Sequence, residues 1–336
     1  MKKEVLADNV RPKNYSLVTF KAMGNISEIM WAQKRNTEIK IKKIDKDYFV
    51  YLDTGEMCEF NHIKNRAEDM NSVRVSLGKL RDLLNTNIAD VTHCRWVTLT
   101  YAENMTNPKK LYRDFGNFNT RLREIVGHYE YIVAREPQGR GAWHCHVVLI
   151  FDEKAPFIPN EVMYTAWKQG WVTVKKLDDV DNVGAYLTAY LGDMEVSEWI
   201  AEKNTGNWKL NITADNIVAD GVNVIEKEFE DENGEKTKKK FVKGARLHMY
   251  PPKFNIYSAS TNIKRPEKEL MTNEDAEKRV IDATLTFERT VQLTDSEIDF
   301  NSLLNYRYYN SKRKAENKNY TANDGILQFL ESRGAS

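Results

Sequence analysis

The chain has 336 residues, of which 41% are hydrophobic and 11% aromatic, so it can bury a sizeable core and is not disordered throughout. Its 50 Lys and Arg nearly balance its 49 Asp and Glu; this net charge of +1, taken alone, argues against a simple nucleic-acid binder, which usually carries a basic excess. Three cysteines, no apolar signal sequence and no long apolar run predict a cytoplasmic protein of about two domains.

The near-zero sum conceals blocks of charge. Residues 11–43 hold eight basic and two acidic residues, and residues 178–232 hold fourteen acidic and three basic residues. Residues 236–265 hold nine basic residues and no acidic one. This asymmetry predicts that any DNA contact is confined to one face, with the acidic segment largely off the DNA path.

The first 88 residues predict an α+β extension. Residues 14–20 (NYSLVTF) have the composition of a strand, and residues 48–60 predict a hairpin with its turn at Asp53-Thr54-Gly55. Apolar residues at helical spacing then predict a helix over 67–86.

Residues 89–265 give the clearest pattern, and residues 266–336 predict a charged, partly helical tail. The helix expected over 108–126 starts at Asn107-Pro108, a cap followed by a proline in the first turn. The strands expected are 96–101, 129–136, 143–151 and 171–177, with further helices near 160–169 and 179–194. This order predicts an antiparallel-centred α+β sheet with helices on one face.

A candidate metal site lies in the predicted hairpin of this segment. His144 and His146 are one residue apart on a strand, so the period of two places both imidazoles on one face. Glu136 ends the preceding strand and faces His144 if the turn closes around residues 139–141. Such a mixed oxygen and nitrogen set suits Mn²⁺ or Mg²⁺ as a Lewis acid. A His-X-His pair alone is more often chance or packing, and a structural zinc site lacks a CxxC pair.

Tyr186 and Tyr190 are four residues apart on a predicted helix and therefore share one side of it. They flank the apolar stripe, so their hydroxyls can remain free. A tyrosine that attacks a phosphodiester forms a covalent phosphotyrosine and keeps the bond energy for rejoining. The alternative is a pair of boundary tyrosines that pack their rings and hydrate their hydroxyls.

Together these patterns resemble the HUH endonucleases, specifically the rolling-circle replication initiator (Rep) proteins of bacterial plasmids, phages and integrative elements. Residues 96–101 (WVTLTY) are similar to their first motif, and residues 136–146 (E-x7-HCH) to their metal-binding second motif. Residues 185–192 (AYLTAYLG) are similar to their third motif in its two-tyrosine form, and residues 243–266 to a basic segment that follows the core. The resemblance covers about residues 90–265.

The resemblance implies a five-stranded antiparallel sheet with the histidines on a central strand and the tyrosine helix beside it. It implies an endonuclease and strand transferase in which Glu136, His144 and His146 hold Mn²⁺ or Mg²⁺. Tyr186 or Tyr190 would nick origin DNA, keep the 5′ phosphate and leave a 3′-OH primer. The implied partners are single-stranded or hairpin origin DNA, a host helicase and a host polymerase, with no membrane.

The third motif departs from the family pattern. Relatives commonly carry a lysine three residues after a motif tyrosine, where this chain has Ala189 and Asp193; Lys175 or Lys176 are candidates to replace it. We expect DNA contacts from the basic side chains Arg135, Arg140, Lys175, Lys176, Lys243 and Arg246, and from the lysines of 238–240. Trp143, Trp171, Tyr250 and Tyr257 are candidates for base stacking, with core packing as the alternative.

Four alternatives remain open. Relaxases of the same superfamily usually carry three histidines and an N-terminal tyrosine, and single-strand transposases are usually smaller with one tyrosine. A non-catalytic origin-binding regulator on the same fold is favoured by the missing lysine. A metal-binding protein unrelated to DNA would form no covalent DNA adduct.

Overall fold

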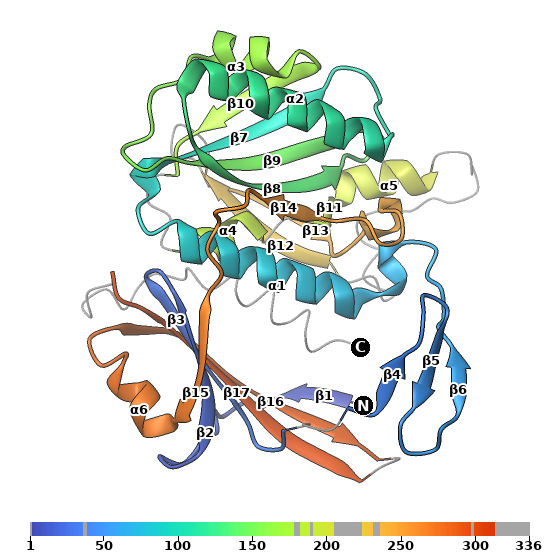
Figure 1. Cartoon of the computed structure of the whole chain (residues 1–336), viewed down its shortest axis with the longest axis vertical. Helices are drawn as coiled ribbons and strands as arrows, with labels where there is room; N and C mark the ends of the chain where they lie inside the picture. Colours follow the sequence, from blue (N-terminus) through green and yellow to red (C-terminus); the bar gives the residue numbers. More distant parts are fainter. Residues whose placement is uncertain are drawn as a thin grey trace.

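Two large sheets lie on either side of the long helix α1 (Met70–Asn87) in a computed structural model of the chain (Figure 1). The structure describes residues 2–35, 39–177, 182–188, 191–204, 224–230, 236–296 and 299–312. Within these residues, no helix combines the length and the apolar character needed to cross a membrane.

The five-stranded sheet contains the segment with the candidate metal ligands. Every neighbouring pair in it is antiparallel. In spatial order its strands are β10 (Gly170–Lys175), β7 (Cys94–Tyr101), β9 (Trp143–Ile150), β8 (Glu130–Pro137) and β14 (Tyr257–Ala259). The four strands predicted here are therefore confirmed, and β9, which bears both histidines, lies at the centre of the sheet.

Helix α2 (Pro108–Val126) covers one face of this sheet together with α3 (Asn160–Trp167). It begins where the Asn107 side chain accepts hydrogen bonds from the first free backbone N–H groups, and it ends before Gly127, whose φ is 82°. Its apolar side chains pack against those of the strands in one core: Leu111, Phe115, Phe118 and Leu122 with Val97, Leu99, Cys145, Val147 and Leu149.

Helices α1 and α4 (Val183–Thr188) cover the other face. Leu80 and Leu84 of α1 pack with Ile132 and Val148 of the sheet, and Val183 of α4 belongs to the same cluster. The prediction of helices on one face is therefore wrong, because the central strands carry apolar side chains on both faces and each face needs a cover. The helix predicted over 179–194 is described only for α4, since residues 178–181 and 189–190 lie outside the described residues.

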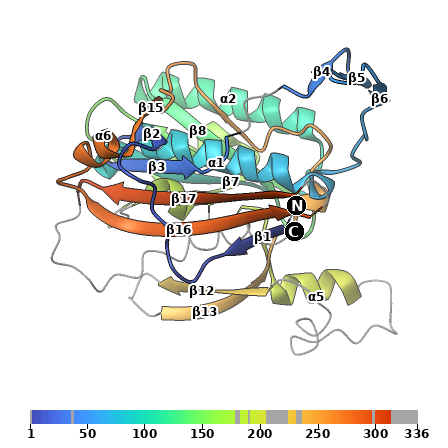
Figure 2. The ribbon, with the colours of Figure 1, turned by 90° about the horizontal axis from the view of Figure 1, so that it is seen from below.

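The six-stranded sheet joins the two ends of the chain. It is formed by β1 (Lys2–Val5), β16 (Thr284–Asp295), β17 (Phe300–Asn310), β3 (Ile26–Ala32), β2 (Leu17–Met23) and β15 (Glu267–Thr272), in that order (Figure 2). All its pairs are antiparallel.

The prediction of a helical tail is wrong over residues 267–310, where α6 (Asn273–Lys278) is the short helix between long strands. Residues 284–310 are rich in β-branched and aromatic side chains, which pack well on a pleated sheet. The remainder of the tail, residues 313–336, lies outside the described residues.

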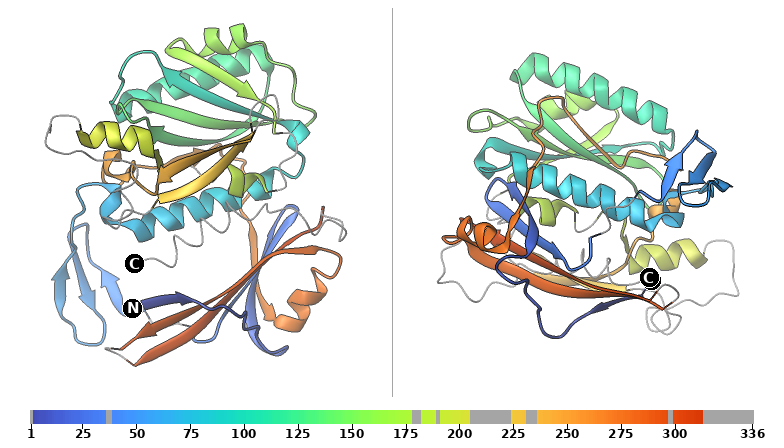
Figure 3. Two further views of the ribbon diagram at one scale, coloured as in Figure 1. Left: turned by 180° about the vertical axis from the view of Figure 1, so that it is seen from behind. Right: turned by 60° about the horizontal axis from the view of Figure 1, so that its bottom comes forward.

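Two small sheets complete the described chain. The predicted hairpin is confirmed by β5 (Tyr48–Tyr51) and β6 (Met57–Glu59), which pair with β4 (Ile41–Lys43). The second small sheet lies beside α5 (Val196–Asn204) and is seen from behind in Figure 3. It consists of β11 (Met194–Glu195), β13 (Lys236–Val242) and β12 (Val224–Glu230).

The second small sheet also pairs the acidic and basic blocks of the sequence. Its register sets Glu226 opposite Lys240 and Glu228 opposite Lys238. Lys238 lies 3.1 Å from Glu226, and Lys239 lies 3.3 Å from Glu195 of β11. Carboxylates of this chain therefore already neighbour the lysine run that the sequence suggested for phosphate contacts.

Buried charges join α1 to the six-stranded sheet. Lys21 of β2 lies 2.8 Å from Glu28 of β3 and 2.9 Å from Asp82 of α1. Arg81 of α1 lies 3.3 Å from Asp82 and donates a hydrogen bond of 3.0 Å to the hydroxyl of Tyr308. This cluster, which we call the α1 ion cluster, fixes α1 against one sheet while its other side packs on the other sheet.

Candidate metal centre

Glu136, His144 and His146 project from one face of the five-stranded sheet. The register of β8 and β9 pairs Glu136 with His144 and Ala134 with His146. Directly paired residues of antiparallel strands share a face, so the hairpin brings the carboxylate and both imidazoles together. The face is the one covered by α1 and α4, because Val148 and Ile132, farther along the same strands, pack against those helices. The facing of Glu136 and His144 predicted from the sequence is confirmed.

The donor atoms of these three side chains converge. His144 Nε2 lies 3.1 Å from Glu136 Oε2, and His146 Nε2 lies 3.1 Å from His144 Nε2 and 3.5 Å from Glu136 Oε2. Ligands placed about 2.1 Å from one cation lie about 3.0 Å apart in octahedral geometry and about 3.4 Å apart in tetrahedral geometry. The three atoms therefore have the spacing of ligands on a single cation, and they form a group of possible metal ligands within the described residues.

The protonation states expected near neutral pH suit coordination. Burial raises the pKa of Glu136, but hydrogen bonds with His144 and His146 and the charge of Arg246 outweigh burial and hold that pKa well below its usual range. Burial lowers the pKa of His144. An ionised carboxylate and a neutral imidazole are the forms that bind a metal ion.

Groups behind the donor atoms orient them. Thr98 Oγ1 lies 3.3 Å from His146 Nδ1, which leaves Nε2 directed at the other two side chains. Glu136 Oε1 accepts a hydrogen bond of 2.9 Å from the Gly192 backbone N–H and lies 3.3 Å from Arg246 Nη1. The protein thus holds one carboxylate oxygen and leaves the other facing the histidines, the arrangement found around bound metals.

The segment that follows the tyrosine helix is attached to this centre. Gly192 has φ 87°, a conformation that favours glycine, and its N–H reaches Glu136. Its carbonyl accepts a hydrogen bond of 2.9 Å from the Arg246 N–H, and Asp193 Oδ1 accepts one of 2.8 Å from the Gly244 N–H. Tyr186 belongs to α4, while its side chain and Tyr190 lie outside the described residues.

Helix α4 is seated closely on α1. The Gly184 N–H donates a hydrogen bond of 2.8 Å to Asn85 Oδ1 of α1. A Cβ at Gly184 would lie 2.4 Å from the Arg81 carbonyl oxygen and 2.7 Å from Asn85 Oδ1. Glycine is therefore what allows the helix that bears Tyr186 to approach α1 this closely.

Two of the arginines expected to contact DNA lie inside the protein. Arg135 is 2% exposed; it donates a hydrogen bond of 2.7 Å to Ser258 Oγ and its guanidinium lies 4.4 Å from the Tyr112 ring centroid. Arg246 is held between Glu136 and Glu198, with Nη2 2.7 Å from the Glu198 carboxylate. The structure gives Arg135 a place in the core and Arg246 a place behind the candidate metal ligand, rather than on an open surface.

The other basic candidates are more accessible. Arg140 is exposed at the β8–β9 turn, where it donates a hydrogen bond of 2.8 Å to the Tyr101 carbonyl. Lys175 and Lys176 are exposed at the end of β10, and Lys243, after β13, is partly exposed. Lys175 pairs with Trp96, which pairs with Val148, so it lies on the sheet face of the histidines but beyond His146.

The aromatic candidates divide in the same way. Trp143 and Tyr250 are 2% and 1% exposed, and Trp143 stacks on Phe254 with the ring centroids 4.5 Å apart. Their assignment to base stacking is therefore wrong, because core packing uses their rings. Trp171 is 59% exposed and pairs with Thr100, which pairs with His144, so an open aromatic ring lies in the same row of the sheet as a candidate metal ligand.

The sequence missed several residues of this site. Thr98 alternates with the core positions of residues 96–101, so its facing followed from strand periodicity. Arg246 and Glu198 reach the centre from segments far from Glu136 in the sequence, and no local pattern marks them.

Residues 94–195 match the family described as replication-associated protein ORF2. The match runs from the first residue of β7 to the last residue of β11 and contains Glu136, His144, His146 and both tyrosines. It covers under a third of the chain and is consistent with a replication initiator. No curated protein and no solved structure matches the chain.

Proposed function

We propose that this protein is a rolling-circle replication initiator of the HUH type, which nicks and rejoins one strand of origin DNA through a phosphotyrosine. The observation that carries the proposal is the convergence of Glu136, His144 and His146 inside the segment that matches a replication-associated family. The hydrogen bond from Gly192 to Glu136 adds support, because it ties the end of the tyrosine segment to the same centre.

Glu136, His144 and His146 would hold a divalent cation, Mn²⁺ or Mg²⁺. When bound, the cation supplies a Lewis acid for a phosphate oxygen and offsets negative charge in the transition state. The chain itself keeps Glu136 ionised and aligned through Arg246 and Gly192.

The proposed reaction is a transesterification. The phenol oxygen of Tyr186 or Tyr190 forms a bond to phosphorus, and the bond between phosphorus and the 3′ oxygen breaks. The proton lost by the phenol is balanced by the proton gained by the 3′ oxygen, which leaves as a 3′-OH primer. The reverse reaction rejoins the strand, and a second tyrosine permits another nick while the first remains esterified.

The surface around the centre suits an unpaired strand. Trp171 offers an exposed ring in the row of His144, and Arg140 is exposed at the turn next to Glu136. Aromatic stacking holds bases without regard to sequence, and basic side chains contact phosphates.

Covalent capture tests the proposal. The protein is incubated with Mn²⁺ and labelled single-stranded and hairpin oligonucleotides that tile the DNA flanking its gene, and the products are separated under denaturing conditions. We expect a labelled protein adduct that disappears in the double variant Tyr186→Phe, Tyr190→Phe. The matched control Tyr164→Phe removes an exposed hydroxyl on α3 and should leave the adduct unchanged.

Other outcomes support the alternatives. A shifted DNA band without an adduct in the unmodified protein would favour a non-catalytic origin-binding regulator. Transfer of the captured strand into unrelated target DNA would favour a transposase. Metal binding without any DNA binding would favour a metal protein unrelated to DNA.

A further inference from the structure

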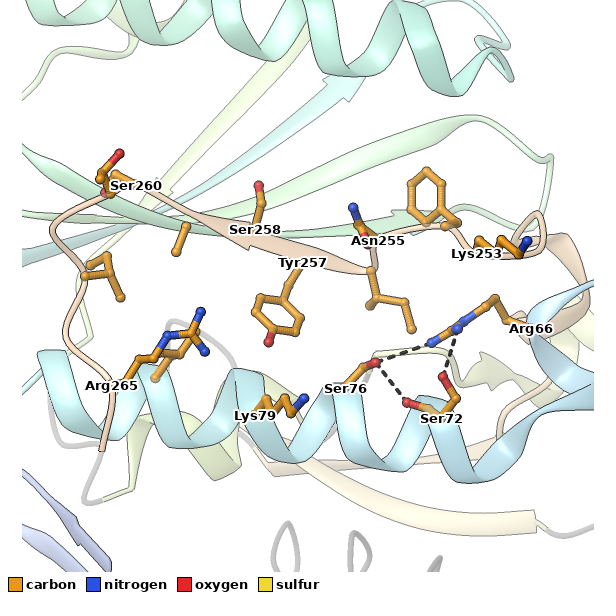
Figure 4. A pocket seen from close by; sticks show the side chains of 16 residues that line it. Arg66, Ser72, Ser76, Lys79, Lys253, Asn255, Tyr257, Ser258, Ser260 and Arg265 are labelled. Atoms are coloured by element: carbon orange, nitrogen blue, oxygen red, sulfur yellow. Dashed lines mark hydrogen bonds between the residues drawn. The ribbon is translucent and has the colours of Figure 1, made fainter. Parts of the chain in front are cut away.

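A long polar groove separates α1 from β14, the edge strand of the five-stranded sheet (Figure 4). Its volume is about 610 Å³. One wall is a single side of α1, formed by Ser72, Ser76, Lys79 and Leu83 at helical spacing, and the other wall is the segment from Lys253 to Arg265.

The groove is positively charged. Arg66, Lys79, Lys253 and Arg265 line it, and no Asp or Glu is among its lining residues. Lys79, Lys253 and Arg265 are exposed, and within the described part of the chain none of them forms an ion pair. In Figure 4, Arg66 and Lys253 lie toward one end of the groove and Arg265 toward the other.

Arg66 is a buried cation without an anionic partner among the described residues. It is 7% exposed, and its guanidinium donates hydrogen bonds of 3.0 and 3.3 Å to the hydroxyls of Ser72 and Ser76. Its Nε has no hydrogen-bond partner among the described residues. Because buried charges in proteins are normally paired, an arginine neutralised only by hydroxyls at the wall of a basic groove indicates a place for an anion.

The edge strand adds uncharged donors. The Arg135 N–H bonds to the Ile256 carbonyl, and the Ser260 N–H bonds to the Tyr131 carbonyl, so the even-numbered residues of this segment face β8. By the alternation of antiparallel pairing, the backbone N–H groups of Tyr257 and Ala259 face away from β8, on the open edge of the sheet beside the groove.

We propose that this groove binds the sugar-phosphate backbone of DNA outside the segment that is held at the candidate metal centre. The wall from Ser72 to Leu83 extends about 16 Å at a rise of about 1.5 Å per residue. Phosphates of one duplex strand follow each other about every 3.4 Å along the axis, so the groove accommodates several. A polyanion thus fits the spread of charge from Arg66 to Arg265 better than a single small anion does. The inference rests on the proposed function for the identity of the polyanion.

Salt-dependent binding tests the groove without knowledge of the origin, because phosphate contacts carry no sequence information. The variant Lys79→Gln, Lys253→Gln, Arg265→Gln removes three exposed charges and should not disturb folding. The matched control Lys109→Gln, Lys154→Gln, Lys168→Gln removes three exposed charges from α2, from the loop between β9 and α3, and from the residue that follows α3. Fluorescence anisotropy measures the affinity of each protein for labelled single-stranded and duplex DNA over a series of salt concentrations.

We expect the groove variant to bind at least one of these DNA forms about tenfold or more weakly at moderate salt. The slope of log K against log salt should fall by about 2.7, since each phosphate contact contributes about 0.9. The control should stay close to the unmodified protein. Equal affinities and equal slopes for the two triple variants would overturn the groove.

The covalent adduct separates this result from the proposed function. At saturating DNA the groove variant should still form the adduct, because the substituted residues do not touch the candidate metal centre. If the unmodified protein forms no adduct but the groove variant loses its salt slope, the proposed nicking fails and the groove stands. If the adduct forms and the slopes are equal, the groove fails and the nicking stands.

Discussion

The molecule holds two groups of buried ionisable side chains on opposite sides of α1, and they differ in how their charges are balanced. The α1 ion cluster combines the cations Lys21 and Arg81 with the anions Glu28 and Asp82, so its formal charge is zero. In the candidate metal centre, the carboxylate of Glu136 and two imidazole nitrogens are directed at one another.

The contrast separates a structural group from a functional one. The α1 ion cluster satisfies itself, which is what a buried group needs in order to stabilise the fold. Two ring nitrogens 3.1 Å apart beside a carboxylate oxygen are complementary to a cation that the chain does not supply. Changes in the first group should therefore alter stability, and changes in the second should alter activity.

The largest effect is expected from the double variant His144→Ala, His146→Ala. Loss of both imidazoles should lower adduct formation with Mn²⁺ by about a thousand-fold or more, since it removes the charge stabilisation at the phosphate. The melting temperature should stay within a few degrees, because both side chains are partly exposed. His128→Ala, at the far end of β8, is the matched control. Full adduct formation in the double variant would rule out this site.

A smaller effect is expected from Gly184→Ala, which links the two groups. The added Cβ would collide with the Arg81 carbonyl and push α4 away from α1. We expect a loss of about 1–3 kcal/mol in the free energy of unfolding. Adduct formation should fall by up to about a hundred-fold, as expected when reacting groups are misplaced by about 1 Å.

Gly116→Ala in α2 is the matched control for this substitution. A Cβ at Gly116 would meet no atom of another element within 4 Å, so alanine there should be neutral or stabilising. If both variants behave alike in urea unfolding and in adduct formation, the close contact of α4 with α1 does not position the tyrosine.

The smallest effect is expected in the pH dependence of stability. Burial raises the pKa of Glu28, but Lys21 and Arg81 outweigh it and lower that pKa from 4.5 to about 2. A lowered pKa in the folded state contributes stability that is complete above pH 4.5 and is lost as the pH falls toward 2. The advantage of the unmodified protein over Glu28→Gln in urea unfolding should therefore shrink over this range. Glu267→Gln, exposed on the same sheet, is the control, and a constant advantage would contradict the prediction.

Local patterns predicted the five-stranded sheet and the core of the site well. Asn107-Pro108 and the apolar spacing predicted α2, and the period of two together with a short turn predicted that Glu136 faces His144. Long-range pairing was not predictable in this way. Residues 26–32 pair with residues 304–310 across most of the chain, and no local periodicity encodes that partnership.

Charge showed the same limit. Arg135 and Arg246 are basic residues in the sequence, yet one is buried against Tyr112 and the other is bound by two carboxylates. Conversely, Arg66 and Lys79 lie outside the basic block of residues 236–265, and only the fold brings them beside Lys253 and Arg265.

The sequence by itself determined which atoms can meet within a hairpin, because a strand alternates its faces and a short turn fixes the register. It therefore placed Glu136, His144 and His146 together. Only the tertiary structure decided which charges are neutralised and which remain available, because that depends on segments far apart in the chain packing side by side. The same packing seated α4 on α1, anchored Gly192 at Glu136 and left a basic groove along the edge of the sheet.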